Sequence, residues 1–471
     1  MLFKTKTKTK TLTAILTASV LSACTMAPTY HRPEVNAPVI DDNNATQANA
    51  VRAVETQWQA YFADPRLKAL IEQALQRNTD LRLAVLNADA ARAQYGIQRS
   101  ELFPNIGASG SMTRNRVSQD LSQTGQAYIA EQYSVGLGVT AWELDLFGKV
   151  RSLNNAAVHN YFAARHSADA AKISIIAAVA KSYFAEKSAQ ESMDYADKTL
   201  KTRQESHRLS EISHKAGVIS DIALNQSLSQ IEQAKAAYAA AKTQRDAARN
   251  ALTVLVGGTL PENLPDGKPL TLEAQFNNQI PAGVSSDILT QRPDILSAEE
   301  QLKTANAQIG AARAAFFPSI KLTGSGGFAT GELDNLFHGT ARVWSFSPQI
   351  SIPIFTWGAV KSGLDLVKVR KEMSIVQYEQ AVQNAFRDTS NALNAQKTLS
   401  EQAAAQEKIA QATGKVLQLT EMRHKHGVSS SLDLLDAQRQ SFTAETALIN
   451  VRLQQLNNRV DLYKAFGGGV K

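Results

Sequence analysis

The sequence predicts a mainly helical chain that also contributes strands to a small membrane β-barrel, and three observations lead to this fold class. The chain contains one unit written twice; each half holds a very long stretch without proline; and each half holds two stretches that alternate between apolar and polar residues. With 471 residues and 44% hydrophobic content, the chain can bury a sizeable core, which excludes an intrinsically disordered protein. Only 25 glycines and 13 prolines punctuate it, so we expect few, long elements.

The N-terminus has the pattern of a secretory signal followed by an acylation site. Residues 1–23 start with four lysines and continue in an apolar run, Leu12–Leu21, that is too short to cross a bilayer as a helix. The next residues, Leu21-Ser22-Ala23-Cys24, resemble the bacterial lipoprotein box, whose cysteine becomes an acylated N-terminus. We therefore expect a lipoprotein signal peptide over 1–23, lipidation of Cys24 and an acylated tether over 24–57. The alternative is an ordinary signal peptide with an incidental cysteine.

Charge and cysteine content exclude several classes of protein. The 50 basic and 43 acidic residues give a net charge of +7, but four of the lysines lie in the expected signal peptide, so the mature chain carries +3. That charge is too weak and too evenly spread for phosphate binding, and we expect no nucleic-acid partner. A single cysteine excludes an internal disulfide and a multi-cysteine metal site.

An internal repeat divides the mature chain into two halves. Residues near the start of the first half recur 214 residues later, and residues further along recur 210 residues later. The recurring positions include Asp80, Gly96, Arg99 and Phe103-Pro104 at the first offset, and Gly148, His214-Lys215, Gly217-Val218 and Gly257-Gly258 at the second. We expect a first repeat over 58–256, an inter-repeat linker over 257–286, a second repeat over 287–466 and a C-terminal tail over 467–471.

Each half is expected to contain a helix, a strand pair, a very long helix, a hairpin tip and another helix. Residues 149–215 and 359–425 contain no proline, and at 1.5 Å per residue each would form a helix of about 100 Å. The last helix carries a heptad seam, made of Leu435, Phe442, Ile449, Leu456 and Tyr463. The helix over 219–255 adds an alanine face beside its bulky one, so its neighbours can lie on both sides and close a ring. A coiled-coil barrel is expected, and a solid bundle core is the alternative.

The strand pairs are expected within 105–147 and 319–355. In the first, Tyr133, Val135, Leu137, Val139 and Ala141 face one way; in the second, Trp344, Phe346, Ile350, Ile352 and Ile354 do. Alternation over about ten residues is typical of outer-membrane strands, although a soluble half-buried sheet alternates in the same way. Four strands are too few for a closed membrane barrel, so the chain must oligomerise. A dimer would supply eight strands and a filled interior, whereas a trimer would supply twelve strands and an aqueous lumen.

This combination of features resembles the TolC-like outer-membrane factor family, and within it the OprM-type efflux lipoproteins. The motifs that carry the resemblance are Phe103-Pro104, Phe317-Pro318, Glu143 to Gly148, Gln291 to Ile295 and Gly467 to Gly469. The resemblance implies a homotrimeric channel-tunnel with a twelve-stranded β-barrel in the outer membrane, a lipid anchor and a long α-helical barrel in the periplasm. It also implies a periplasmic adaptor (membrane fusion) protein and an inner-membrane pump of the resistance-nodulation-division type as partners.

Two glycine turns, Gly217-Val218 and Gly427-Val428, separate a long helix from a shorter one in each half and so form the tips of two helical hairpins. Glycine suits the positive-φ residue of such a turn, and the exposed valine beside it can contact another helical hairpin. Plain turns are the alternative. The resemblance implies that the tips contact the adaptor.

Asp433 and Asp436 follow the second tip, three residues apart and so on one helix face. In a trimer they would form a ring of carboxylates that favours cations and in which the acids raise one another's pKa. The alternative is a pair of solvated acids at the positive end of a helix dipole. By resemblance they match the family's paired-aspartate constriction, with Leu432 as the adjacent apolar ring. Ser429 stands where TolC has an arginine that helps to hold the closed state.

No set of residues indicates an enzyme. Gly324, Gly326 and Gly327 follow an expected strand but open no helix, so they do not form a phosphate loop. His424 and His426 lie on different helix faces without acidic or cysteine partners, so no metal site is expected. We therefore expect a passive export duct for drugs or other small toxic solutes, without a cofactor and gated at its periplasmic end. The alternative is a lipid-anchored coiled-coil scaffold or adhesin without a pore.

Overall fold

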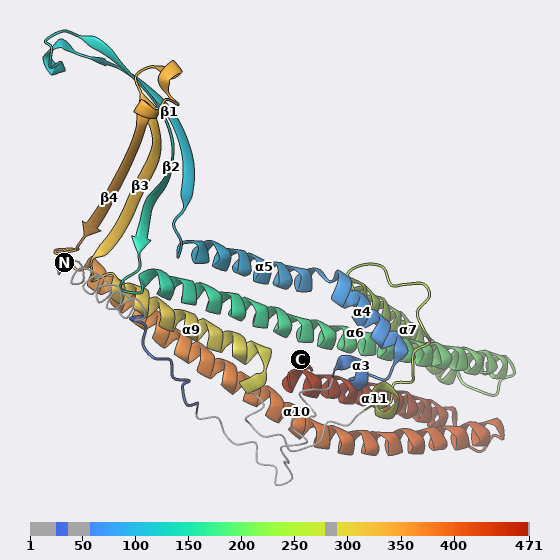
Figure 1. The fold of residues 1–471 in the computed structure, drawn as a ribbon. Helices are drawn as coiled ribbons and strands as arrows, with labels where there is room; N and C mark the ends of the chain where they lie inside the picture. The colour runs from blue at the N-terminus through green and yellow to red at the C-terminus, as the bar shows by residue number, and fades with distance from the viewer. Residues whose placement is uncertain (1–24, 36–56, 278–289, 470–471) are drawn as a thin grey trace. The chain divides into compact units, whose positions relative to one another are not determined.

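The structure, a computed structural model, describes residues 25–35, 57–277 and 290–469. The expected signal peptide, Cys24 and parts of the tether, linker and tail lie outside these residues. The helices are α3 (Trp58–Tyr61), α4 (Pro65–Arg77), α5 (Thr79–Ser100), α6 (Lys149–Lys215), α7 (Asp221–Leu255), α8 (Leu272–Gln275), α9 (Pro293–Ala314), α10 (Ala359–Lys425) and α11 (Ser431–Ala465). The strands are β1 (Ile106–Val117), β2 (Tyr128–Leu144), β3 (Ser319–Thr330) and β4 (Arg342–Ser351) (Figure 1).

The two proline-free ranges form single helices, α6 and α10, of 67 residues each. Without proline, no backbone N–H is missing from the i to i−4 ladder and no ring clashes with the preceding turn, so neither helix is interrupted. None of the helices among the described residues combines the length and the apolar composition that a bilayer crossing requires.

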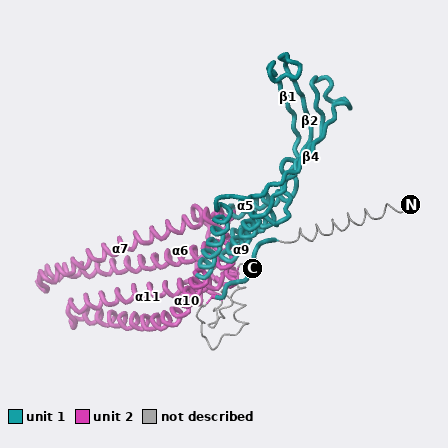
Figure 2. The backbone as a smooth tube through the Cα atoms, turned by 90° about the vertical axis from the view of Figure 1, so that its left-hand side faces the viewer, with its two compact units in different colours: residues 1–34, 86–165, 297–379 teal, residues 35–85, 166–296, 380–471 magenta. Residues whose placement is uncertain are grey.

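The chain divides into two compact units. Unit 1 comprises residues 1–34, 86–165 and 297–379, and unit 2 comprises residues 35–85, 166–296 and 380–471 (Figure 2). Both α6 and α10 contribute their first part to unit 1 and the remainder to unit 2.

Unit 1 contains an antiparallel sheet with the order β1-β2-β3-β4. Residues that pair directly across strands lie on the same face, so the register assigns every side chain to one side of the sheet. One face is apolar and includes Ile106, Met112, Val135, Leu137, Val139, Leu322, Phe328, Trp344 and Phe346. The other carries glycines and hydroxyls, among them Ser109, Ser111, Ser134, Gly136, Gly138, Ser325, Ser345 and Ser347.

Both faces are open to solvent in the single chain. On the polar face, the hydroxyls of Ser111 and Ser134 and those of Ser325 and Ser345 pair across strands at 2.7 Å. On the apolar face, Trp344 is 82% exposed and Leu137 is 61% exposed. The apolar side of this sheet is therefore largely uncovered by the described residues, apart from Phe328, against which Phe337 of the β3–β4 connection packs at 5.8 Å between ring centroids.

Two details of the predicted alternation are wrong. β2 contains a bulge between Val139 and Trp142, where Ala141 has a φ of +51° and donates its N–H to Thr323 Oγ1 at 3.1 Å. The extra residue shifts the alternation, so Trp142 rather than Ala141 lies on the apolar face, paired with Leu322. At the other end, β4 stops at Ser351, so Ile352 and Ile354 lie beyond the strand. Pro353 between them has no N–H to continue the ladder.

Unit 2 is built around an aromatic core. Tyr61 stacks on Tyr463 at 5.0 Å between ring centroids, Phe62 packs against both rings, and Phe276 packs against Tyr61 and Phe62. Tyr61, Phe62 and Tyr463 are each at most 2% exposed. Because Phe276 follows α8 and lies within the expected linker over 257–286, this core includes part of the segment between the two halves.

The helices of unit 2 lie in two pairs, α6 with α7 and α10 with α11 (Figures 1 and 2). The side chain of Asn458 on α11 donates to the Ala392 carbonyl of α10 at 3.1 Å, and Gln406 donates to the Ala444 carbonyl at 3.0 Å. In the expected heptad seam of α11, Ile449, Leu456 and Tyr463 are at most 4% exposed, whereas Leu435 and Phe442 are only half-buried. The seam is therefore buried towards the C-terminus and opens towards the tip.

Candidate functional site

Both hairpin tips end their long helix with the same local geometry. Gly217 and Gly427 each have a φ of +72°, and a Cβ added at either would meet nothing within 4 Å. The Val218 N–H donates to the Ser213 carbonyl at 2.8 Å, and the Val428 N–H donates to the Arg423 carbonyl at 2.9 Å. With the accompanying bonds from the two glycine N–H groups, each tip is a Schellman motif. Glycine is needed here for its backbone conformation, not for lack of space.

Serine begins the next helix at both tips. The Ser220 hydroxyl accepts from the Ala223 N–H, and the Ser430 hydroxyl accepts from the Asp433 N–H. Both tips also present two aliphatic side chains to solvent. Val218 and Ile222 are 75% and 71% exposed, and Val428 and Leu432 are both 64% exposed. The predicted tip residues therefore lie on two similar, exposed apolar ends.

Asp433 completes a capping box at the start of α11. Its Oδ2 accepts from the Ser430 N–H at 3.0 Å and from the Ser430 hydroxyl at 2.8 Å. These hydrogen bonds, from the hydroxyl first and then the backbone, lower the pKa of the fully exposed Asp433 carboxyl. This cap is not among the sequence predictions for Asp433. A serine three residues before an acid is nevertheless a recognisable capping signal, so the sequence contained the information.

Asp436 has an arginine partner one turn further along. Arg439 Nη2 lies 2.7 Å from Asp436 Oδ1, and Gln440 Nε2 donates to Oδ2 at 2.5 Å. The hydrogen bond from Arg439 lowers the pKa of Asp436, and the charge of Asp433 opposes this only weakly. In the single chain each carboxylate therefore has its own donor and a lowered pKa, and the mutual rise in pKa expected in a trimer stays a prediction.

The second tip also contains an arginine that the spacing did not single out. Arg423 Nε donates to Ser429 Oγ at 3.1 Å, and His424 Nδ1 lies 2.9 Å from the Ser429 carbonyl oxygen. Because Arg423 reaches Ser429 across the turn, only the turn geometry could have indicated the contact. Ser429 is therefore tied to the preceding helix. Within the described residues, no three His, Cys, Asp or Glu side chains gather as metal ligands would.

Comparisons with known proteins agree with this arrangement. The family model described as "Outer membrane efflux protein" matches residues 70–258 and 284–468. The chain is 44% identical over 462 residues to the probable efflux pump outer membrane protein TtgC of Pseudomonas putida, covering 96% of this chain and 94% of the relative. It is 38% identical to the outer membrane protein OprJ of Pseudomonas aeruginosa, covering 97% and 95%.

Solved structures are similar over nearly the whole chain. The open state of the MtrE outer membrane channel of Neisseria gonorrhoeae matches with a TM-score of 0.86 and 46% identity, covering 95% of this chain and 99% of that one. A structure of CusC, described with its transmembrane channel formation, matches with a TM-score of 0.83 and 34% identity, covering 94% and 100%. The expected resemblance is thereby confirmed, and the chain belongs to the outer membrane efflux protein family.

Proposed function

We propose that this protein is the outer-membrane channel component of a tripartite efflux pump and acts as a passive export duct for small toxic solutes. Relatives over nearly the full length are named as outer membrane proteins of antibiotic, solvent and toluene efflux pumps. We expect drugs or apolar solutes as its cargo. The duct needs no cofactor, because its work is to provide a continuous passage rather than a reaction.

The single observation that carries the channel is the two-faced sheet of unit 1. The apolar side of β3 runs from Ile320 to Phe328, about 27 Å along the strand at ~3.4 Å per residue. At a tilt of about 40° this covers roughly 21 Å of membrane, close to the ~25 Å apolar band of outer-membrane strands. On the same face, beyond Met112, Arg114 and Glu131 form an ion pair of 2.9 Å, as suits a position outside the hydrocarbon.

Three copies of the chain form a homotrimer, which closes the β-barrel and the helical barrel. Within the described residues, the edge strands β1 and β4 each have a neighbour on one side only. An unpaired strand edge is unfavourable in lipid, so β4 of one copy pairs with β1 of the next. Three copies then supply a twelve-stranded β-barrel, and the two repeats of each copy supply the helices of a coiled-coil barrel in the periplasm.

The hairpin tips are the docking points for a periplasmic adaptor protein, which links the channel to a resistance-nodulation-division pump in the inner membrane. Val218 and Val428 are exposed beside their glycines, and an apolar end of this kind fits the apolar face of a partner hairpin. The adaptor opens the duct by binding the splayed tips better than the closed ones.

Leu432, Asp433 and Asp436 form the constriction that the tips open and close. Trimer symmetry brings three copies of each acid to one ring, where the like charges raise the pKa of both from the lowered values of the single chain. At its other end, the channel is anchored in the outer membrane by acyl groups on Cys24, as the lipoprotein box suggests.

Planar-bilayer conductance tests this function against the alternative of a poreless scaffold or adhesin. Native mass spectrometry of the purified full-length protein in detergent should detect a trimer. In planar bilayers this trimer should form pores that prefer cations. A stable monomer, or a trimer that never conducts even with its constriction acids replaced, would refute the duct.

A further inference from the structure

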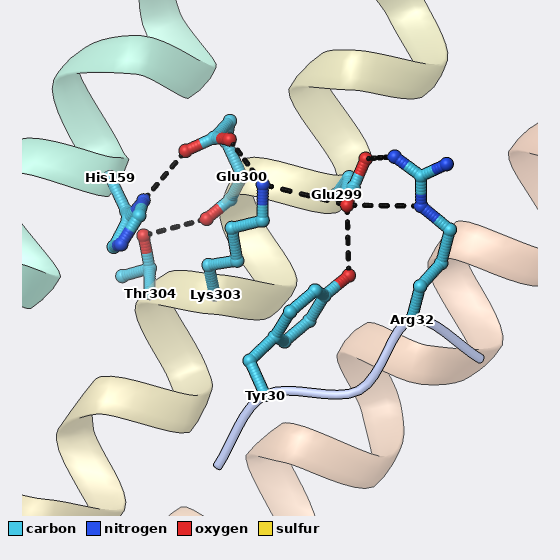
Figure 3. Close-up of polar contacts among 7 residues, drawn as sticks. All are labelled: Tyr30, Arg32, His159, Glu299, Glu300, Lys303 and Thr304. Atoms are coloured by element: carbon cyan, nitrogen blue, oxygen red, sulfur yellow. Dashed lines mark hydrogen bonds and ion pairs between the residues drawn. The ribbon is translucent and has the colours of Figure 1, made fainter. Parts of the chain in front are cut away.

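The segment that follows Cys24 is held on α9 by a buried carboxylate. Arg32 donates from Nε and Nη2 to the two oxygens of Glu299, at 3.1 and 2.7 Å, and the Tyr30 hydroxyl donates to Oε1 at 3.1 Å (Figure 3). The Glu299 side chain is 5% exposed, and Lys303 adds a second cation at 3.4 Å. A paired, nearly buried carboxylate fixes this part of the segment firmly, since removing its partner would leave an uncompensated charge.

The segment continues antiparallel to α9 as far as Thr25. Asn306 Nδ2 donates to the Pro28 carbonyl at 2.7 Å, and Arg313 donates to the Met26 carbonyl at 3.1 Å. Between these two contacts, a Cβ at Gly310 would lie 2.7 Å from the Ala27 nitrogen, so only glycine admits the backbone this closely. Thr25 ends the run with its hydroxyl 3.1 Å from the Ser152 hydroxyl.

This course leads the chain to a shallow apolar depression where α9 ends. Its lining consists of Thr25, Met26, Ala27, Arg313, Phe316 and Phe317. The two phenylalanines are 45% and 41% exposed, and Phe317 also stacks on Phe147 at 4.8 Å. Two adjacent aromatic rings therefore remain partly open to solvent beside the first described residue of the chain.

We propose that this depression seats the first methylene groups of an acyl chain attached to Cys24. Cys24 directly precedes Thr25, so a single peptide bond joins the acylated residue to a residue of the lining. An acyl chain is the apolar ligand that such a surface favours, and its cover would remove both rings from water. The proposal rests on the lipidation in the proposed function and adds a protein site at which the lipid begins its path.

Photo-cross-linking in cells tests this proposal. Cells expressing the full-length protein are fed a palmitate analogue with a diazirine, irradiated, and the purified trimer is digested with trypsin. Cleavage after Arg313 and Lys321 releases the peptide 314–321, which contains both phenylalanines, and cleavage after Arg52 releases the N-terminal peptide 24–52. We expect a covalent product that joins 24–52 to 314–321 through the acyl chain.

Two variants and one control sharpen the result. Phe316→Ala should reduce the joined product severalfold, and Glu299→Gln should reduce it by loosening the segment while leaving Phe316 and Phe317 themselves unaltered. Phe103→Ala is the control. Phe103 is 65% exposed, matches Phe317 in the internal repeat and does not line the depression, so its removal should leave the yield unchanged. The location of the label in the unaltered protein does not depend on whether a variant folds.

The possible outcomes distinguish the proposed seat of the acyl chain from the lipidation of Cys24 on which it rests. An intact mass without acyl groups would refute the lipidation itself. An acylated chain whose 24–52 peptide is cross-linked only to bilayer lipids or to strand peptides would overturn the seat and leave the lipidation standing. Peptide 314–321 labelled by free phospholipid alone would overturn the seat as well.

Discussion

Asp64 is a buried carboxylate that ties the inter-repeat linker to the helices of unit 2, and its removal should cost much stability. Asp64 itself is 0% exposed. Its Oδ1 accepts from the Arg66 N–H at 2.8 Å and so caps α4. Its Oδ2 accepts from the Tyr183 hydroxyl at 2.7 Å, the Lys268 N–H at 3.0 Å and Gln275 Nε2 at 3.2 Å. One side chain thus connects α4, α6 and the linker.

The magnitude for Asp64→Ala follows from the donors left behind. Loss of the helix cap costs about 1 kcal/mol. Gln275 Nε2 keeps the carbonyls of Lys268 and Pro269, each at 2.9 Å, so only the Tyr183 hydroxyl and the Lys268 N–H lose their acceptor. Each stranded donor costs about 1–3 kcal/mol, which places the total at about 3–7 kcal/mol. Burial and the bond to Asp64 raise the pKa of Tyr183, so its hydroxyl remains a donor.

Urea unfolding in detergent, followed by far-ultraviolet circular dichroism, measures this effect. Asp64→Ala should lower the unfolding free energy strongly, and adding Tyr183→Phe should restore part of the loss by removing one stranded donor. Asp461→Ala is the matched control, because its ion pair with Lys181 is 46% and 37% exposed and should contribute at most about 1 kcal/mol. Equal effects of Asp64→Ala and Asp461→Ala would refute the assignment of Asp64 as a buried hub.

Three further predictions concern the N-terminal segment, the constriction and the tips. Burial raises the pKa of Glu299, but the hydrogen bond from Arg32 and the charge of Lys303 outweigh burial, so the folded pKa lies below the usual 4.5. The ionised Glu299 therefore stabilises the fold above pH 4.5, and this stabilisation is lost as the pH falls through the lower folded pKa. Glu299→Gln should consequently reduce the melting temperature at neutral pH but hardly at acid pH. Alanine at Asp433 and Asp436 should raise single-channel conductance and weaken cation preference, whereas Asp221→Ala at the other tip should change neither; an unchanged pore would remove both acids from the gate. Gly427→Ala should destabilise its tip by about 1–2 kcal/mol because Gly427 has a φ of +72°, and Gly427→Asn should destabilise it by less. Hydrogen exchange of the tip amides measures this difference. Equal protection of these amides in the two variants would contradict the conformational argument.

Local sequence signals predicted the regular elements well. The absence of proline predicted α6 and α10, glycine predicted the turn at each tip, and alternation predicted that strands occur near Gln132 and Trp344. Each signal acts within a few residues, through backbone hydrogen bonds and side-chain direction, so it can be recognised without knowing the partner. The aspartate pair was likewise visible from its spacing alone, and its role in a constriction stays a prediction.

The sequence by itself determined that this chain forms long helices, two glycine tips and strands with one apolar side, and its motifs determined the family. Only the tertiary structure decided the bulge at Ala141, the docking of residues 25–32 on α9 and the junction at Asp64. Each of these depends on a contact between residues far apart in the chain: Ala141 with Thr323, Arg32 with Glu299, Asp64 with Tyr183. Local patterns carry no record of such contacts, because the partner is fixed by packing rather than by spacing.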